Sequence, residues 1–409
     1  MTTEKLYLDA PGDGQPLLTF QATVLEVVHY RDRPAVILNR TAFYPEGGGQ
    51  LGDRGHLRIE GRSLAVNDVQ IDDRGRILHL IDDAEPQDWL QAEIEGQVDA
   101  SHRRDMMSQH TGQHMLSAAF FTLAGLETVS ARLGSRISTV DLNSPKLDES
   151  TIERVVAHVN DLVLEDRVVR PIYPNAEELA RMNLRRAPKV SEDVRILEIE
   201  GFDVTPCGGT HCARTGQVGA VHVVSTERIK GMTRVNFLCG RRTLEYFREL
   251  ERQARQAAAV QGCTPAELAE NLTGQRETMR TYQQELGRLR ARNAEREAAE
   301  LLASHQPTAS EWTPIVVVRE SDVDSARKLA NSLIRREDVL AAIFSRENAD
   351  SDWRVILSRG SNAAFDCGKW FREAGRELGA RGGGRPNHAE GKLPLSVDPN
   401  TITWTRAAG

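Results

Sequence analysis

Two short stretches, His110-Thr-Gly-Gln-His114 and Cys207-Gly-Gly-Thr-His211, decide how this chain folds around one site. Each stretch places two metal-binding side chains four residues apart, a spacing that puts both on one face of a helix. The first lies in an apolar periodic run, 106–123, which predicts a helix, and the second follows Pro206 and predicts a tight loop. Three imidazoles and one thiolate form a ligand set typical of zinc. The sequence therefore predicts a zinc site formed by His110, His114, Cys207 and His211. The alternative is a chance histidine pair and a buried thiol.

The composition is that of an ordinary globular protein. The chain has 409 residues, of which 40% are apolar and 27% charged, and this length predicts two to four domains. The N-terminus lacks the basic region and apolar run of a signal peptide, and no apolar stretch of about 18 residues predicts a membrane span. Five irregularly spaced cysteines indicate a reducing compartment, so we expect a cytoplasmic protein without membrane association.

The net charge of −7 counts against a nucleic-acid partner without excluding one. Phosphate contacts need only a local basic surface, because each contact neutralises a single charge. One local cluster contains Arg181, Arg185, Arg186 and Lys189. Clusters of this kind are more often solvated surface than a binding site.

The N-terminal segment, 1–95, has the pattern of a small β-barrel or sandwich. Short apolar runs within 18–38 and strand-like pieces at 57–59, 64–71 and 77–81 are separated by glycine-containing turns. Between them stands Thr41-Ala-Phe-Tyr-Pro-Glu-Gly-Gly-Gly-Gln50-Leu-Gly-Asp53-Arg-Gly55. Glycine content alone indicates a flexible turn. The aromatic pair before the glycines and Gln50 after them favour a loop that faces a ligand.

The central segment, 96–240, has a mixed pattern of helices and strands. A second helix is expected over 148–164 with Asp148 or Ser150 as its N-cap. Strands are expected at 136–142, 168–173, 194–200, 218–224 and 233–238. Both halves of the metal site therefore lie in one α+β domain. Ligands this far apart in sequence indicate a folded pocket, unlike the closely spaced ligands of a zinc finger.

The segment 241–305 is rich in Arg, Glu, Gln and Ala and predicts helices. Thr264, Pro265 and Glu267 have the pattern of a capping box with proline at the first helical position. The helix that follows carries a seam with alternating steps of four and three residues, formed by Leu268, Leu272, Gln275, Met279, Tyr282, Leu286, Leu289 and Asn293. Such a seam predicts an antiparallel helical hairpin or a homodimer. We interpret this segment as a spacer.

The last segment, 306–409, returns to an α/β pattern. Strands are expected at 315–318, 340–344 and 355–357, and helices at 322–336 and 366–379. Near the end stands Arg381-Gly-Gly-Gly-Arg385-Pro-Asn-His388-Ala-Glu-Gly391-Lys392. Glycines beside Arg and Lys can present N–H groups and charge to phosphates, although P-loop spacing is absent. The alternative is a flexible surface loop.

Four motifs occur here in the order found in alanyl-tRNA editing proteins and in the editing half of alanyl-tRNA synthetase: GGGQLGDRG, HTGQH, CGGTHC and the KGMTRVNF of 230–237. The histidine and cysteine motifs also resemble the editing domain of threonyl-tRNA synthetase. The GGGQ loop and its barrel resemble the alanyl type. The resemblance covers essentially the whole sequence, and without an aminoacylation domain in it we expect a freestanding, long-form editing protein.

This resemblance implies hydrolysis of the ester that joins serine, and also glycine, to the tRNA for alanine. Zinc would either lower the pKa of a water molecule or orient the substrate; a structural zinc is the alternative, because four side-chain ligands leave no open position. Gln50 is the candidate catalytic residue, as a polar group that contacts the aminoacyl adenosine. The end of the chain resembles the DHH-associated domain of alanyl-tRNA synthetases, which implies nucleic-acid contacts for Arg381, Arg385 and Lys392. Without DHH phosphoesterase motifs, a phosphodiesterase is not expected.

The predicted architecture is thus α+β and multidomain. It comprises a β-barrel with the GGGQ loop (1–95), a zinc-binding editing domain (96–240), a helical connector (241–305) and a C-terminal α/β domain (306–409). The predicted protein is a zinc-containing aminoacyl-tRNA deacylase whose partner is mischarged tRNA. It could form a homodimer through the connector or the C-terminal domain. The alternatives are a zinc-stabilised tRNA-binding protein without hydrolysis, and an editor of serine on the tRNA for threonine.

Overall fold

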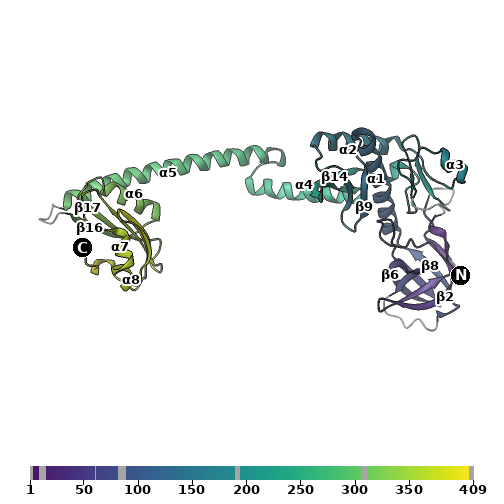
Figure 1. Ribbon diagram of the computed structural model, residues 1–409, viewed down its shortest axis with the longest axis horizontal. Helices are drawn as coiled ribbons and strands as arrows, with labels where there is room; N and C mark the ends of the chain where they lie inside the picture. The colour runs from purple at the N-terminus through teal and green to yellow at the C-terminus, as the bar shows by residue number, and fades with distance from the viewer. Residues whose placement is uncertain are drawn as a thin grey trace. The chain divides into compact units, whose positions relative to one another are not determined.

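A computed structural model describes residues 3–8, 15–59, 61–81, 89–188, 194–305 and 312–404. The chain forms two compact units, Met1–Gln256 and Ala257–Gly409 (Figure 1). The boundary between them falls inside a helix, α4, Arg241–Gln261. The boundaries predicted above for the four domains stay predictions. The broad expectation of a mixed α and β chain of several domains is confirmed.

The first unit begins with a closed six-stranded barrel. Its strand order is β2 (Thr19–Tyr30), β3 (Arg33–Leu38), β7 (Ile77–Ile81), β6 (Arg62–Ile71), β5 (Gly55–Ile59) and β8 (Glu93–Val98). Burial alternates along β5 and β8, as expected when successive side chains point to opposite faces of a barrel wall. The barrel was predicted, but β8 was not. Two further short strands, β1 (Glu4–Lys5) and β4 (Arg40–Thr41), pair in parallel, and a 3-10 helix, Leu6–Leu8, follows β1.

His79 is fully buried in the barrel core, where Thr41 Oγ1 lies 2.8 Å from its Nε2 and the Val36 carbonyl 3.1 Å from its Nδ1. Burial lowers the pKa of His79 to about 4. The unfolded chain therefore binds the proton first as the pH falls, and between about pH 6.5 and 4 the barrel should lose about 3 kcal/mol of free energy of unfolding. A proton NMR titration of the ring checks this. Protonation of His79 near pH 6.5 in the folded protein would contradict it.

The second part of this unit packs helices against two antiparallel sheets. The larger sheet has the order β14 (Val221–Ile229), β15 (Met232–Cys239), β10 (Ser138–Leu142) and β9 (Thr128–Leu133). The smaller has the order β11 (Val169–Ile172), β12 (Ile196–Ile199) and β13 (Asp203–Pro206). Two helices, α1 (Ala100–Ala124) and α2 (Glu149–Glu165), share one buried core with these sheets. The predicted helices and strands of this region are confirmed, and β9 and β13 are strands that were not predicted. A short helix, α3, spans Ala176–Arg181.

The caps of these helices follow the sequence. Asp99 caps α1 by accepting hydrogen bonds from the N–H groups of Ser101 and His102, and Gly125 ends the helix in the left-handed conformation. Of the two residues expected to cap α2, Asp148 does so by accepting from Thr151 N. Because α1 follows β8 directly, the barrel wall fixes where the helix that carries the two histidines begins (Figure 1).

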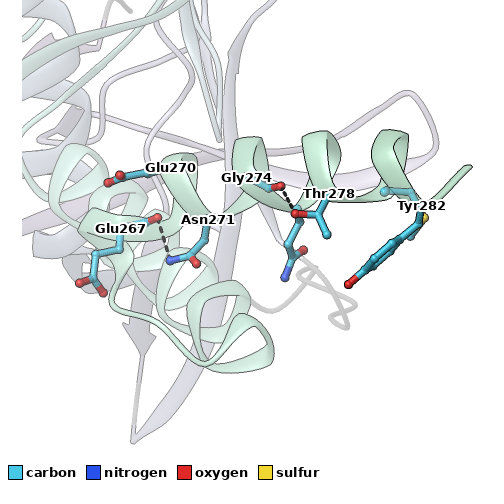
Figure 2. A pocket seen from close by; sticks show the side chains of 8 residues that line it. Glu267, Glu270, Asn271, Gly274, Thr278 and Tyr282 are labelled. Carbon is cyan, nitrogen blue, oxygen red and sulfur yellow. Dashed lines mark hydrogen bonds between the residues drawn. The ribbon is translucent and has the colours of Figure 1, made fainter. Parts of the chain in front are cut away.

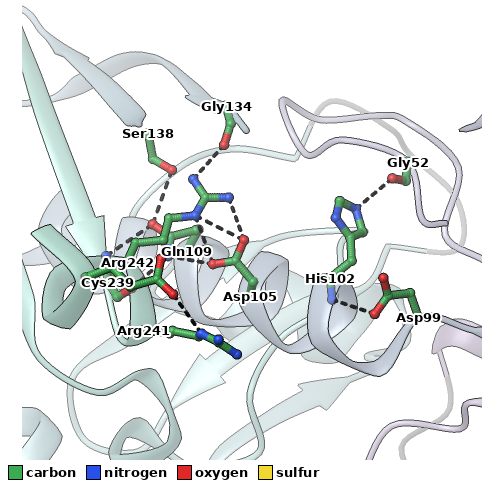
Figure 3. Close-up of polar contacts among 11 residues, drawn as sticks. Gly52, Asp99, His102, Asp105, Gln109, Gly134, Ser138, Cys239, Arg241 and Arg242 are labelled. Carbon is green, nitrogen blue, oxygen red and sulfur yellow. Dashed lines mark hydrogen bonds and ion pairs between the residues drawn. The ribbon is translucent and has the colours of Figure 1, made fainter. Parts of the chain in front are cut away.

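Polar contacts hold α1 to the barrel on one side and to the larger sheet on the other. His102 Nε2 lies 3.0 Å from the carbonyl of Gly52, in the barrel loop (Figure 3). Arg242 forms a bidentate ion pair with Asp105 and also donates to the carbonyl of Gly134, 2.7 Å away. One turn further along α1, Gln109 accepts from Cys239 N and donates to its carbonyl. The helix is therefore fixed in place just before its two histidines.

Arg103, on the same helix, is almost wholly buried and binds Asp53 of the GGGQLGD loop. Its guanidinium also donates to the carbonyl of Ala42, 2.6 Å away. Asp53 in turn accepts from Tyr44 N at 2.6 Å. A buried charge pair costs free energy unless its hydrogen bonds are satisfied, and these additional contacts satisfy them. The pair fixes the barrel loop against the helix that carries the histidines.

The second unit contains the long helix α5 (Leu268–Ser304). The predicted capping box is present, because Thr264 and Glu267 each bond the other's backbone around a short 3-10 helix, Pro265–Glu267. Most of the predicted seam is exposed, including Leu272, Met279, Tyr282, Leu286 and Leu289. Beside the start of this seam, Glu267, Asn271, Thr278 and neighbouring residues line a groove of about 650 Å³ (Figure 2). Asn271 donates to the carbonyl of Glu267, which precedes α5, and Thr278 to that of Gly274 in α5, so both side chains bond the local backbone.

The C-terminal sheet has the order β16 (Thr313–Glu320), β17 (Val339–Arg346), β18 (Trp353–Arg359), β20 (His388–Leu393) and β19 (Arg381–Arg385). One helix, α6, spans Val323–Leu333 and packs on this sheet. The helix expected over 366–379 is divided into α7 (Cys367–Arg372) and α8 (Ala374–Glu377). Gly375 follows the break, and a Cβ there would lie 2.9 Å from the Trp370 ring. Trp370 and its neighbours form part of a buried core on this sheet.

The glycine-rich stretch near the C-terminus forms an antiparallel hairpin of β19 and β20, and the alternative of a flexible loop is therefore wrong. A Cβ on Gly382 would lie 2.9 Å from the Phe371 ring, so glycine allows α7 to pack closely on the hairpin.

No helix in the described part of the chain is long and apolar enough to cross a membrane.

Candidate metal centre

Four side chains from the two quoted motifs converge in the first unit. His110 and His114 lie on α1, and Cys207 and His211 lie on the loop that follows β13. Their candidate ligand atoms all lie within 4.8 Å of one another. Cys207 Sγ is 3.4 Å from His110 Nε2 and 3.2 Å from His211 Nε2. The structure therefore brings together the four residues predicted from spacing alone.

The cysteine loop is shaped by its own backbone contacts. Cys207 N donates to the carbonyl of Arg195, and the Arg195 guanidinium donates back to the carbonyls of Cys207 and Gly209. The α-carbon of Gly209 packs directly on the His110 ring, since a Cβ there would lie 2.2 Å from its Cε1. Glycine is therefore needed where the loop crosses the first histidine. Gly208 has open space around it.

Gln50 reaches this centre from the barrel loop and is fully buried. Its Oε1 lies 2.8 Å from His110 Nδ1 and accepts from Thr210 N, while its Nε2 donates to Thr210 Oγ1. The loop lies close to β9, where Leu133 N donates to the carbonyl of Gly49, and a Cβ on Gly49 would lie 2.5 Å from the Ala131 carbonyl oxygen. These contacts favour a role in orienting His110 over the substrate contact that we expected from the loop. The catalytic role of Gln50 stays a prediction.

The other two imidazoles each face a polar side chain at Nδ1, within hydrogen-bond distance only for His211. Thr111 Oγ1 lies 3.2 Å from His211 Nδ1 and accepts from Cys212 N. Asp203 Oδ2 lies 3.8 Å from His114 Nδ1. Sequence reasoning missed both residues, although Thr111 stands inside the HTGQH motif. No sequence motif points to Asp203 in the same way, because it lies on β13, which was not predicted.

The charges in the centre are coupled. Burial alone would raise the pKa of the Cys207 thiol, but the neighbouring imidazoles of His110, His211 and His114 hold that pKa well below its usual value. Burial opposes a charge on His114, but Cys207 and Asp203 raise its pKa to about 9. Burial and the neighbouring His110 lower the pKa of His211 well below its usual value. The centre thus favours the thiolate, which is the form of cysteine that binds a metal.

These residues fit a zinc ion. A thiolate and three imidazoles are ligands that zinc accepts, and His110 and His211 present Nε2 to Cys207 while Nδ1 faces another group. The Nδ1 partners are what metal-binding histidines commonly have. A bound zinc ion would be held by Cys207 Sγ, by Nε2 of His110 and His211, and by a ring nitrogen of His114. The metal-ligand role of the four residues stays a prediction.

Comparison with known proteins finds similar domains and chains. The family model "Threonyl and Alanyl tRNA synthetase second additional domain" matches residues 194–236, which include Cys207 and His211. The model "tRNA synthetases class II (A)" matches 13–102, and the DHHA1 domain matches 313–401. The alanyl-tRNA editing protein AlaX-L of Pyrococcus horikoshii is 28% identical over 400 residues, which cover 95% of this chain and 94% of that protein. The chain resembles long-form alanyl-tRNA editing proteins.

Larger proteins are similar as well. The alanine–tRNA ligase of Pyrobaculum calidifontis is 33% identical over 412 residues, which cover 97% of this chain and 43% of the ligase. The chain thus spans about two fifths of that relative. The C-Ala domain of Aquifex aeolicus alanyl-tRNA synthetase, a solved structure, matches 22% of this chain and 85% of its own, with 22% sequence identity and a TM-score of 0.20. A score this low says nothing about the fold.

Within the part of the chain that matches the DHHA1 model, the three cations predicted to bind nucleic acid lie on the hairpin and are exposed. Arg381 is paired with Lys392 across the strands, and Arg385 is on the same face because it is four residues from Arg381. Lys392 is also paired with Arg354 of β18, which sequence reasoning missed. Among the described residues, none of these four cations is in an ion pair. We call Arg354, Arg381, Arg385 and Lys392 the hairpin cations.

The earlier basic cluster does not form one surface. Arg185 is largely buried and binds Asp203, whereas Arg181 is exposed and near Glu177. Lys189 lies outside the described residues. The cluster therefore contributes one structural ion pair next to the metal centre.

Proposed function

We propose that this chain hydrolyses the ester of mischarged tRNA for alanine, removing serine and, in addition, glycine. The convergence of His110, His114, Cys207 and His211 in one buried cluster, in a chain that resembles alanyl-tRNA editing proteins, carries the proposal. A zinc ion held by these residues would supply Lewis-acid chemistry to an ester beside it. The protein would act in the cytoplasm.

A small pocket next to His211 is the site that we propose for the amino acid. Its lining includes Tyr7, Thr210 and His211, and its volume is about 60 Å³. A hydroxyl group on the substrate could pair with the polar groups of Tyr7 and Thr210. Recognition of a hydroxyl by a polar partner discriminates far better than exclusion by size, which is why an editing site can separate serine from alanine.

The test is deacylation of purified tRNAs, each charged with one labelled amino acid, with and without a chelator. We expect serine to leave the tRNA for alanine, and the chelator to stop the reaction. Correctly charged alanine should stay attached. Release of serine only from the tRNA for threonine would support the threonyl-type editor. Tight binding of tRNA without hydrolysis, together with bound zinc, would support a zinc-stabilised binding protein.

The hairpin cations are proposed to contact tRNA phosphates away from the metal centre. Replacing Arg381, Arg385 and Lys392 together by alanine should weaken tRNA binding and leave the rate of hydrolysis at saturating tRNA nearly unchanged. This is expected when the lost contacts bind the substrate and the transition state equally well. Each lost phosphate contact should flatten the slope of log affinity against log salt by roughly 0.7–0.9. Filter binding at several salt concentrations measures this slope.

The matched control replaces Arg372 and Arg376, which are also exposed but lie on α7 and α8. This control should bind tRNA as the unmodified protein does. Equal losses of affinity per removed charge in the two variants would mean that overall charge matters and not the hairpin. Homodimer formation through the exposed seam of α5 remains a further prediction.

A further inference from the structure

The three imidazoles of the metal centre differ in what holds Nδ1. His110 faces the neutral amide of Gln50 and His211 faces the neutral hydroxyl of Thr111, both within hydrogen-bond distance. His114 Nδ1 is fully buried and makes no hydrogen bond among the described residues. The group that faces it is the carboxylate of Asp203, 3.8 Å away. His114 is thus the one ligand of the three with a charged outer partner.

Asp203 is itself held rigidly. Its side chain is 2% exposed and accepts two hydrogen bonds from Arg185, of 2.8 Å to Oδ1 and 2.9 Å to Oδ2. The Arg185 backbone also bonds β13, through its N–H and the carbonyl of Val204. Two charge-assisted bonds in a fixed fork fix the plane of the carboxylate. Its Oδ2 consequently faces both the guanidinium and the His114 ring.

Asp203 also stands on the strand that leads to the other ligands. It begins β13, and Cys207 follows the end of that strand, so the carboxylate and the cysteine loop share one backbone. The His114 ring, from α1, faces Asp203 at Nδ1 and belongs to the same cluster as Cys207. A carboxylate at Nδ1 favours the tautomer with the proton on Nδ1, which leaves the Nε2 lone pair for an ion and makes it a stronger ligand.

We propose that Asp203 is a positioning residue that holds His114 for metal binding, and that Arg185 keeps Asp203 in place. The inference rests on the metal-binding part of the proposed function. Asp203 does not have to touch the substrate for this role. It acts through His114 alone.

The experiment measures zinc affinity by competition with a chromophoric chelator, using the full chain stripped of metal. Asp203→Asn keeps the shape of the side chain and removes its charge. We expect its zinc affinity to fall by about 10–100-fold, the usual cost of losing an outer partner of a metal ligand. The absorption spectrum of the Co²⁺-loaded protein should shift too, since the ligand field of His114 changes.

Asp141→Asn is the matched control. Asp141 is 5% exposed and is also held by a bidentate arginine, Arg234, in the same unit, but it contacts none of the four ligands. The zinc affinity of Asp141→Asn should stay within about twofold of that of the unmodified protein. Its Co²⁺ spectrum should be unchanged. Equal losses in the two variants would mean that a buried ion pair merely supports the fold, and would overturn the proposal.

A double-mutant cycle locates the effect. In a His114→Ala background, Asp203→Asn should cause no further loss of zinc affinity, because the ring through which it acts is gone. A full additional loss would overturn the proposal, as would an Asp203→Asn protein that binds zinc normally. If Asp203→Asn does not fold, the zinc affinity of Arg185→Gln tests the proposal instead. A measurable loss of affinity supports the inference and normal affinity overturns it.

These measurements need no tRNA, so they separate this inference from the proposed reaction. Weakened zinc binding in Asp203→Asn without any deacylase activity in the unmodified protein would keep the inference and reject the function. An unmodified protein that binds no zinc would reject the metal centre and the inference together.

Discussion

Replacing Cys207 by serine is expected to abolish stable zinc binding and, with it, deacylation. Cys207 is the one thiolate of the cluster, and Nε2 atoms of two histidines face its sulfur. The neighbouring histidines lower the pKa of the Cys207 thiol and so favour the charged thiolate, whereas a serine hydroxyl would be neutral. The loss of zinc affinity should exceed the roughly 10–100-fold that removal of an outer partner costs, because a direct ligand is lost.

The measurement combines zinc content, chelator competition and the deacylation rate of one preparation. Cys212→Ala is the control, since Cys212 is a buried thiol in the same loop whose pKa is raised to about 11 by burial, so it stays a neutral packing residue. That variant should keep one zinc and lose only some stability, as expected for removal of a small buried group. A Cys207→Ser protein with normal zinc affinity would exclude the thiolate as a ligand.

The ligands could be predicted from sequence because their geometry is local. The four-residue spacing places His110 and His114 on one helical face, and Gly-Gly between Cys207 and His211 predicts a tight loop, whatever the rest of the chain does. Helix caps at Asp148 and Thr264 were predictable for the same reason, since a cap bonds residues two or three positions away.

The outer partners could not be predicted, because they depend on which segments meet in space. Gln50 bonds His110 across 60 positions of sequence, and that contact depends on how the barrel loop packs on β9 and on α1. Asp203 meets His114 from a strand whose alternation was too short to recognise. The hairpin cations show the same limit, because Arg354 joins Lys392 only through the strand register.

Some expectations failed because the sequence gives no sign of close packing. The run of glycines at 382–384 has the composition of a flexible loop, yet strand pairing and the nearby Phe371 ring make it an ordered hairpin. The helix over 366–379 has a continuous apolar pattern but is interrupted at Glu373. In both places tertiary contacts decide between conformations that local propensity leaves nearly equal.

Gly209→Ala is expected to disrupt the metal centre although it adds only one methyl group. A Cβ at this position would lie 2.2 Å from His110 Cε1, 2.5 Å from His110 Nδ1 and 2.9 Å from Gln50 Oε1. The ring and the amide are both buried and bonded to each other, so neither can move away freely. We expect zinc affinity to fall at least about tenfold, as for loss of an outer partner, and stability to fall by about 1–3 kcal/mol from overpacking.

The neighbouring glycine supplies the control, because a Cβ on Gly208 would have open space around it. Gly208→Ala should therefore bind zinc and hydrolyse mischarged tRNA nearly as the unmodified chain does. In a His110→Ala background the added methyl group at position 209 meets empty space where the ring was, so Gly209→Ala should cost little further zinc affinity or stability. Two results would contradict this prediction: an equal loss of zinc affinity in Gly208→Ala and Gly209→Ala, or an undiminished loss from Gly209→Ala in the His110→Ala background. Either result would show that Gly209 is needed for the loop backbone and not for the orientation of His110.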